Sequence, residues 1–330
     1  MAEWIYEDGI GEARAALVHK GRIVEAQIER DSDQARTGAI AGGRMVEQRI
    51  AKLRGIVRLD SGEDVLLEPI PPKLTEGGRV TVEILREAII EPGRAKLAKA
   101  RAVKGAAKPA PGKKLLQRIR MTGHNVLIAS PHDAEDRLEE AGWSELLEEA
   151  ASGEVAFDGG ALRIALTPAM TVIDIDGPLK PAELAKRGSA ATGDAIRRMG
   201  IAGSIGIDFP TLEEKAARAA IADAFDAVLP QPFERTAVNG FGLMQVVRRR
   251  ERASLVELIQ YAPVESAALA LLRRAERAQG TGLATITAPP AVIALLESRP
   301  DWGGQLARSL GREISLASDA GLGIHGSYVS

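Results

Sequence analysis

Apolar and polar positions alternate in short runs along the first third of the chain. Residues 13–30 contain an apolar run, a turn at His19-Lys20-Gly21 and then alternation from Ile23 to Glu29, which predicts a β-hairpin. Between residues 37 and 93, runs such as EDVLLEPI and GGRVTVEIL are separated by Gly, Asp and Pro. Several short strands at close spacing are typical of a small barrel or sandwich, and we favour an OB-like barrel.

After residue 122 the pattern changes to strands that alternate with amphipathic helices. Strands are predicted in HNVLIAS, ALRIALTPAMTVIDIDG, GSIGIDF and FGLMQVVRRR. A capped helix is predicted to begin at Thr211, because Glu214 follows three residues later. This alternation predicts an α/β domain with a mixed sheet.

These patterns divide the chain into four predicted parts. They are an N-terminal β-hairpin (1–36), an OB-like barrel (37–93), a basic linker (94–122) and an α/β catalytic domain (123–330). Residues 94–120 contain ten Lys and Arg and no Asp or Glu. Such a run can be a solvated, flexible linker or a clamp that holds phosphates without regard to sequence, and the two readings are equally open.

The amino-acid composition limits the classes of protein to which this chain can belong. The chain has 330 residues, of which 45% are hydrophobic and 27% charged, the balance of a soluble globular protein. No run approaches the roughly 20 apolar residues that span a bilayer, and the acidic start does not resemble a signal peptide. We therefore expect a cytoplasmic protein without membrane contact.

The metal-binding residue types are oxygen donors. The sequence has no Cys and four His, so disulfides are excluded and structural zinc is not expected. A catalytic metal would then be magnesium, with manganese as the alternative. Residues 1–122 contain 23 Lys and Arg against 17 Asp and Glu, whereas the remainder contains 20 against 28. This asymmetry suits a polyanion-binding module joined to a metal-binding one, although chance segregation of surface charge explains it equally well.

Two predicted strands end in aspartate. Asp174 ends TVID, with Asp176 two residues further on, and Asp208 ends SIGID after an intervening helix. Ligands collect beyond the carboxyl ends of strands in open α/β sheets, so the carboxylates can share one magnesium ion. The alternative, that each Asp only starts a turn, stays open from the pattern alone.

Three segments resemble the catalytic region of the ribonuclease E/G family. They are LLEEAASGEVAFDGGALRIALTPAMTVIDIDG, IRRMGIAGSIGIDF and NGFGLMQVVRRRERASL, in the family's order and spacing. Weaker similarity extends to GGRVTVEILREAIIEPGRAKL and to GIHGSYVS. The resemblance implies an OB-fold inserted in an RNase-H-like subdomain, followed by a catalytic subdomain of DNase-I-like topology.

The same resemblance implies an activity and a site. The activity is magnesium-dependent endonuclease cleavage of single-stranded RNA, as in RNA processing. The family's two magnesium aspartates fall on Asp174 and Asp208, and its supporting Asn falls on Asp176. Candidate phosphate-binding residues are the basic ones of the linker and of the RRR segment: Arg94, Lys96, Lys99, Arg101, Lys113, Lys114, Arg248, Arg249 and Arg250.

The chain departs from the family's pattern in several places. The barrel segment lacks the aromatic residues that stack on bases, and the segment at Leu127–Asp133 looks shortened, without the Arg-Thr pair of the 5′-monophosphate sensor. The Cys-X-X-Cys zinc link between subunits is absent, so a homodimer, if one forms, is not linked by zinc.

Two other functions stay open. A non-catalytic RNA-binding homologue would keep the fold without turnover. IDIDG also resembles the opening motif of haloacid-dehalogenase-like phosphatases, in which Asp174 would be the nucleophile. Among the aromatic residues, Phe157, Phe209, Phe225 and Phe241 are predicted to lie in the core, and Phe233 in an exposed loop.

Overall fold

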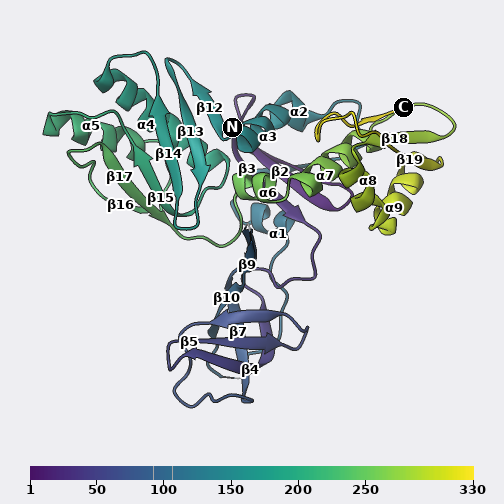
Figure 1. Cartoon of the computed structure of the whole chain (residues 1–330), viewed down its shortest axis with the longest axis horizontal. Coiled ribbons are helices and arrows are strands. Elements are labelled where there is room, and N and C mark those ends of the chain that lie inside the picture. Colours follow the sequence, from purple (N-terminus) through teal and green to yellow (C-terminus); the bar gives the residue numbers. More distant parts are fainter. Residues whose placement is uncertain (92, 106) are drawn as a thin grey trace. The chain divides into compact units, whose positions relative to one another are not determined.

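The structure, a computed structural model, describes residues 1–91, 93–105 and 107–330. It is a mixed α/β protein with a closed five-stranded barrel and several sheets (Figure 1). The chain forms two compact units. The first contains Met1–Asp31, Ile119–Ser152 and Leu255–Ser330, and the second contains Ser32–Arg118 and Gly153–Ser254. The first unit is therefore assembled from three segments that are far apart in sequence.

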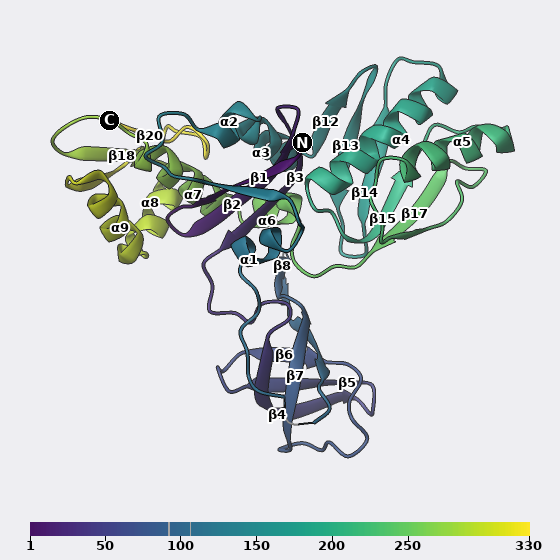
Figure 2. The same cartoon turned by 180° about the vertical axis from the view of Figure 1, so that it is seen from behind.

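A four-stranded sheet in the order β11-β1-β2-β3 begins the first unit (Figure 2). Its strands are β1 (Glu3–Asp8), β2 (Glu12–His19), β3 (Arg22–Arg30) and β11 (Asn125–Ala129). The predicted hairpin is confirmed as β2 and β3, and its turn places Lys20 and Gly21 at φ 51° and 75°. Strand β11 pairs in parallel with β1, while the other pairs are antiparallel.

A network of buried ion pairs crosses this first unit. The Arg14 guanidinium, only 1% exposed, has its Nε 3.0 Å from Glu7 Oε1 and its Nη2 2.7 Å from Asp136 Oδ2. Arg277 Nε lies 3.2 Å from the same Asp136 oxygen, and Arg277 also pairs with Glu7. These residues come from all three segments of the unit, so the network ties the segments together.

The C-terminal segment completes the first unit with helices packed on a three-stranded sheet in the order β19-β18-β20. Its buried core includes Leu272, Ile286, Trp302 and Leu306. The helices of the unit are α2 (Arg137–Glu140), α3 (Trp143–Ser152), α6 (Leu255–Tyr261), α7 (Pro263–Glu276), α8 (Pro290–Glu297) and α9 (Pro300–Leu310). The strands are β18 (Ala284–Ala288), β19 (Ile314–Ser318) and β20 (Tyr328–Val329).

Within the described ranges, no one helix has the length and apolar character needed to cross a membrane. Helices α6 and α7, which meet at a bend of 105°, satisfy that test only when they are taken together, on length and composition. Six α7 residues, from Ala267 to Ala275, belong to the buried core of the first unit, and Val264 packs against it.

The second unit contains the closed barrel, with strands in the order β10-β6-β5-β4-β7 (Figure 1). The strands are β4 (Ile40–Ile50), β5 (Arg54–Leu59), β6 (Asp64–Leu67), β7 (Arg79–Arg86) and β10 (Ala98–Ala102). Between β7 and β10 the chain forms two short paired strands, β8 (Ile89–Glu91) and β9 (Arg94–Lys96). Helix α1 (Leu115–Arg120) follows β10 in the chain.

The barrel extends beyond residue 93, into the part that the sequence pattern assigns to the basic linker. Strand β10 closes the barrel by pairing with both β6 and β7. Its inward residues Ala98 and Ala100 are fully buried, while Lys99 and Arg101 alternate with them. Alanine is too small to stand out as an apolar stripe, which is why the alternation resembles a charged linker.

A six-stranded mixed sheet in the order β12-β13-β14-β15-β17-β16 forms the rest of the second unit. Helix α4 packs on β13 and β14, and α5 lies beside α4 (Figures 1 and 2). The strands are β12 (Glu154–Phe157), β13 (Gly160–Leu166), β14 (Thr171–Asp176), β15 (Gly203–Asp208), β16 (Glu234–Arg235) and β17 (Leu243–Arg248). The helices are α4 (Pro181–Arg198) and α5 (Lys215–Asp226).

The predicted start of α5 is wrong. The helix begins at Lys215, and Glu214 is its N-cap without a side-chain capping bond. Arg218 Nη1 instead donates to the Leu212 and Glu213 carbonyl oxygens, at 2.6 and 2.7 Å. These bonds hold the preceding residues as a loop, so Thr211 is not a helix cap.

Candidate metal site

Asp174 and Asp208 lie opposite each other on two neighbouring parallel strands. In the register of β14 with β15, Asp174 is the partner of Asp208 (strands labelled in Figures 1 and 2). Residues that are in register on adjacent strands project from the same face of a sheet. Their neighbours Ile173 and Ile207 are fully buried and project from the other face. The structure therefore brings the two predicted aspartates to the same face at one end of the sheet.

Close packing of α4 against β14 fixes the strand that carries Asp174. A Cβ atom at Gly188 would lie 2.4 Å from Ile175 Cγ2, so only glycine allows the helix to approach this strand so closely. On the same strand, Ile173 and Ile175 are buried, whereas Asp174 is half-buried and Asp176 is exposed. The apolar face thus anchors the strand, and the polar face is left to solvent.

Asp176 and an arginine that sequence reasoning missed extend this polar face. Asp176 lies two residues after Asp174, on the same face, and its Oδ2 is 3.4 Å from Arg163 Nη1. Arg163 lies on β13, where it is the register partner of Asp174. Its position in GALRIAL signals an outward residue, but only the strand pairing reveals that it lies beside the aspartates. Both side chains of the ion pair are more than half exposed.

The aspartates repel one another. Partial burial, and then the negative charges of Asp176 and Asp208, raise the pKa of the Asp174 carboxyl above its ordinary value. Arg163 acts in the opposite direction and offsets part of that rise. A cation at the site would relieve the repulsion and favour the ionised carboxylate.

The donor set fits a hard divalent cation. Among the residues that the structure describes, no three His, Asp or Glu side chains converge as a complete metal cage. Magnesium does not need such a cage, because it usually keeps several waters and binds through one or two carboxylates. Asp174 and Asp208 supply two carboxylates on one face, and Asp176 lies beside them.

Phe241 lies opposite to its predicted position, whereas Phe233 lies in a loop as predicted but is half-buried rather than exposed. Phe241, expected in the core, is 86% exposed, and it immediately precedes a turn glycine at the start of β17. Phe233, expected in an exposed loop, packs edge-to-face on buried Phe225 with ring centroids 5.6 Å apart. Phe209 and Phe225 are buried as predicted. The flanking apolar residues in NGFGLM made Phe241 resemble a core position.

Several predicted phosphate-binding residues are paired with acids. Lys96 Nζ lies 2.7 Å from Glu91 Oε1, Lys99 Nζ lies 3.1 Å from Glu68 Oε2, and Arg101 Nη2 lies 2.7 Å from Glu83 Oε2. Their charge is therefore partly neutralised. The structure leaves Lys113 and Lys114 exposed, and the side chain of Arg94 lies outside the described part.

The three arginines at the end of β17 differ from one another. Arg248 Nη1 donates to the carbonyl oxygens of Ile201, at 3.0 Å, and of Ile196, at 3.4 Å, so it supports the fold. Arg249 is 67% exposed and lies 3.4 Å from Glu251. Arg250 is half-buried. Of the three, Arg249 has the side chain best placed to reach a ligand from solvent.

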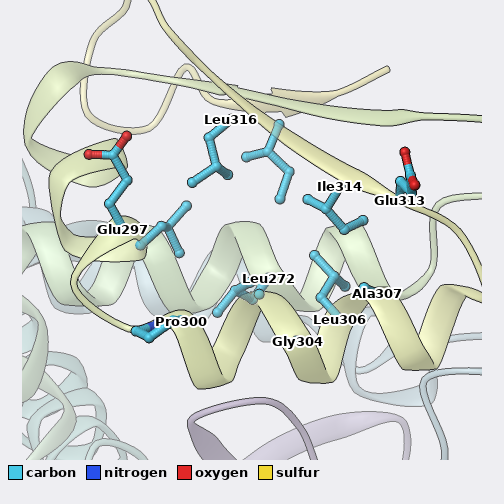
Figure 3. A pocket seen from close by; sticks show the side chains of 12 residues that line it. Leu272, Glu297, Pro300, Gly304, Leu306, Ala307, Glu313, Ile314 and Leu316 are labelled. Carbon is cyan, nitrogen blue, oxygen red and sulfur yellow. The ribbon is translucent and has the colours of Figure 1, made fainter.

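A pocket in the first unit has a different character. It measures about 520 Å³ and lies among α7, α8, α9, β18 and β19. Figure 3 shows Glu297 and Glu313 at its opposite ends, with apolar side chains such as Leu272 and Leu316 between them. Its lining offers an apolar surface and no nucleophile, so it does not suit phosphodiester chemistry.

No protein-family model matches this chain, and a comparison with curated proteins also found no match. The geometry of the site is therefore the main guide to function. Strand β14 pairs antiparallel with β13 on one side and parallel with β15 on the other. A phosphatase of the haloacid-dehalogenase type would carry its nucleophile on a strand of an all-parallel sheet. The mixed pairing of β14 therefore does not favour that alternative.

Proposed function

We propose that this protein is a magnesium-dependent endoribonuclease of the ribonuclease E/G type that cleaves single-stranded RNA. The observation that carries the proposal is the in-register pair of Asp174 and Asp208 on the face of the sheet opposite its apolar core. Two carboxylates in register on adjacent strands, with Asp176 on the same face, are suited to one hard cation and a phosphate backbone.

Each residue of the site has a proposed role. Asp174 and Asp208 hold the ion, which is magnesium or alternatively manganese, and Asp176 supports them. When bound, the ion activates a water and neutralises the charge that develops on the phosphodiester. Arg163, held by Asp176 at 3.4 Å, supplies a positive charge at the same face and orients a phosphate oxygen toward the aspartates.

The topology of the parts supports the finer fold assignment. Numbered within the barrel, the strands follow the order 1-2-3-5-4 and close back on strand 1, with 3 and 5 parallel, which is the arrangement of an OB-fold. In the first unit, three antiparallel strands precede a fourth that pairs in parallel with the first, as in an RNase-H-like sheet. We propose that the barrel is an OB-fold inserted in that RNase-H-like part.

RNA binding through the barrel would depend on cations rather than on stacking, because residues 37–118 contain no Phe, Trp or Tyr. We expect RNA affinity to fall steeply with salt. For four to six phosphate contacts, the loss between 50 and 200 mM salt is on the order of 50- to 300-fold. Fluorescence anisotropy of a labelled single strand measures it.

A paired substitution tests which cations contribute to this salt dependence. The double change Lys113→Gln and Lys114→Gln is expected to reduce the slope of log affinity against log salt by about 1.4, roughly 0.7 for each lost contact. The double change Lys20→Gln and Arg22→Gln alters the net charge equally, at an exposed turn of the first unit, and serves as the control. A flat salt response in the unaltered protein would rule out the basic clamp.

A non-catalytic RNA-binding homologue is the second candidate, and the absence of aromatic residues from the barrel favours it. Incubation of the protein with an unstructured RNA distinguishes the two. We expect internal cleavage in magnesium and none in excess chelator. Binding without cleavage in magnesium would instead support the non-catalytic homologue, and equal cleavage in chelator would contradict the proposed metal site.

A further inference from the structure

A rigid turn holds Phe241 out in solvent. The Asn239 side-chain oxygen accepts hydrogen bonds from the backbone N–H groups of Phe241, at 2.9 Å, and Leu243, at 3.0 Å. Gly242 has φ +92°, and a Cβ atom there would lie 2.2 Å from the Phe209 carbonyl oxygen, so only glycine fits. The phenylalanine ring is 86% exposed on this fixed backbone.

The same turn is joined to the strand that carries Asp208. The Phe209 N–H donates to the Gly242 carbonyl oxygen at 3.1 Å, and Leu243 is the register partner of Asp208. Leu243 and Val247, on the face of β17 that Asp208 shares, are each 46% exposed. Leu243 therefore lies next to Asp208, Phe241 is two residues before Leu243 in the chain, and Val247 lies further along the same face, opposite Ser204.

We propose that Phe241 stacks on a nucleobase of the RNA strand whose backbone lies at Asp174 and Asp208. This inference rests on the proposed RNA-directed function and adds a positioning residue to it. An aromatic ring stacks on any base, so the contact holds a strand without reading its sequence. With one base fixed at Phe241, a phosphate a short way along the strand is held at the carboxylates.

Several observations favour a base as the occupant. Exposed aromatic surface is unfavourably hydrated in the free protein, and because the backbone of this turn is already fixed, binding costs little backbone entropy. The barrel has no aromatic residue, so a stacking contact must come from elsewhere in the chain. Arg163 beside the aspartates supplies a cation for the phosphate, and Leu243 supplies an apolar surface for the sugar or base edge.

The test uses a single-stranded RNA with one 2-aminopurine, moved stepwise along the strand, in chelator so that the strand stays intact. We expect the protein to quench the fluorescence strongly at one position. Phe241→Ala should remove that quench and weaken binding about 5- to 150-fold, the range of one stacked base. Phe241→Trp, which keeps an aromatic ring, should retain both. Tyr328→Ala removes another half-exposed aromatic residue and should change neither.

The outcomes separate this inference from the proposed activity. Because the quench is measured in chelator, it does not depend on cleavage, and a protein that stacks RNA without cutting it would contradict only the endonuclease proposal. Stacking is wrong if the unaltered protein shows no position-dependent quench, or if Phe241→Ala keeps it. It is also wrong if Phe241→Ala instead changes the mass of the protein in solution, which would identify a second copy as the occupant.

Discussion

Asp174→Asn and Asp208→Asn are each expected to reduce RNA cleavage by a factor on the order of 10³ or more, since each removes a charged ligand from the centre of the site. An amide keeps the size of the side chain but binds a divalent cation weakly. RNA affinity should change less than about threefold, because the strand is held mainly by cations and stacking. Gel analysis of cleaved RNA and anisotropy of bound RNA give the two readouts.

Asp223→Asn is the matched control for these two changes. Asp223 is an exposed aspartate on α5, and its substitution should leave cleavage unchanged. Full activity in either site variant would exclude these residues as metal ligands.

The same variants have a readout that does not depend on activity. A ligand at ten times its Kd stabilises a protein by about 1.4 kcal/mol, so magnesium should raise the melting temperature of the unaltered protein but not of Asp174→Asn. Without metal, the site instead lowers the stability of the folded protein, because the carboxylates repel one another. Because the pKa of Asp174 is raised in the folded state, its stability contribution declines as pH rises through that pKa. Asp208→Asn removes one repelling charge and should melt higher than the unaltered protein at neutral pH in chelator.

Arg14→Met is expected to destabilise the first unit by about 3–5 kcal/mol, the cost of removing the most buried cation from the ion-pair network. Glu7 would lose its contact with Arg14 at 3.0 Å, and Asp136 would lose one at 2.7 Å. Methionine fills much of the arginine volume, so the loss reports the charge rather than a cavity. Urea unfolding followed by tryptophan fluorescence measures it, because Trp4, Trp143 and Trp302 all lie in this unit.

A surface ion pair provides the comparison. Arg79 contacts Asp60 at 2.8 Å, but both side chains are more than half exposed, so Arg79→Met should change stability by less than about 1 kcal/mol. A similar small loss in Arg14→Met would show that the buried network contributes little.

The buried network also predicts a pH dependence. Burial alone would raise the pKa of Asp136, but Arg14 and Arg277 hold it below its ordinary value. Stability from this carboxylate is therefore present above its unfolded pKa and is lost as pH falls through the folded one. In Arg14→Met, acid unfolding should begin at a higher pH than in the unaltered protein.

Strong periodicity made several elements predictable from sequence. The alternation around Lys20 and Gly21 gives the β2–β3 hairpin, and the apolar runs before Asp174 and Asp208 give β14 and β15. Elements built from small residues were harder to recognise. Strand β10 buries Ala98 and Ala100, which carry little hydrophobic signal, and so it was hidden among the lysines and arginines of its neighbourhood.

The site could be predicted only in part, for a related reason. Asp174 and Asp208 end apolar strands, and that local pattern is visible in sequence. Arg163 lies beside them only because β13 pairs with β14, and strand pairing depends on contacts that a local pattern does not contain. The apolar neighbours of Phe241 resemble a core strand and wrongly predict burial, whereas the Asn239 side chain and Gly242 hold a turn from which it is exposed.

The three-segment construction of the first unit has a consequence for its synthesis. Arg14 and Glu7 leave the ribosome early, but Arg277, which pairs with Glu7, is translated more than 260 residues later. At ribosomal speeds of about 5–20 residues per second, the delay is on the order of 10–50 s. During that time the barrel segment can fold on the nascent chain, while the N-terminal sheet, with its charged residues still in water, cannot complete its interior until the last segment emerges.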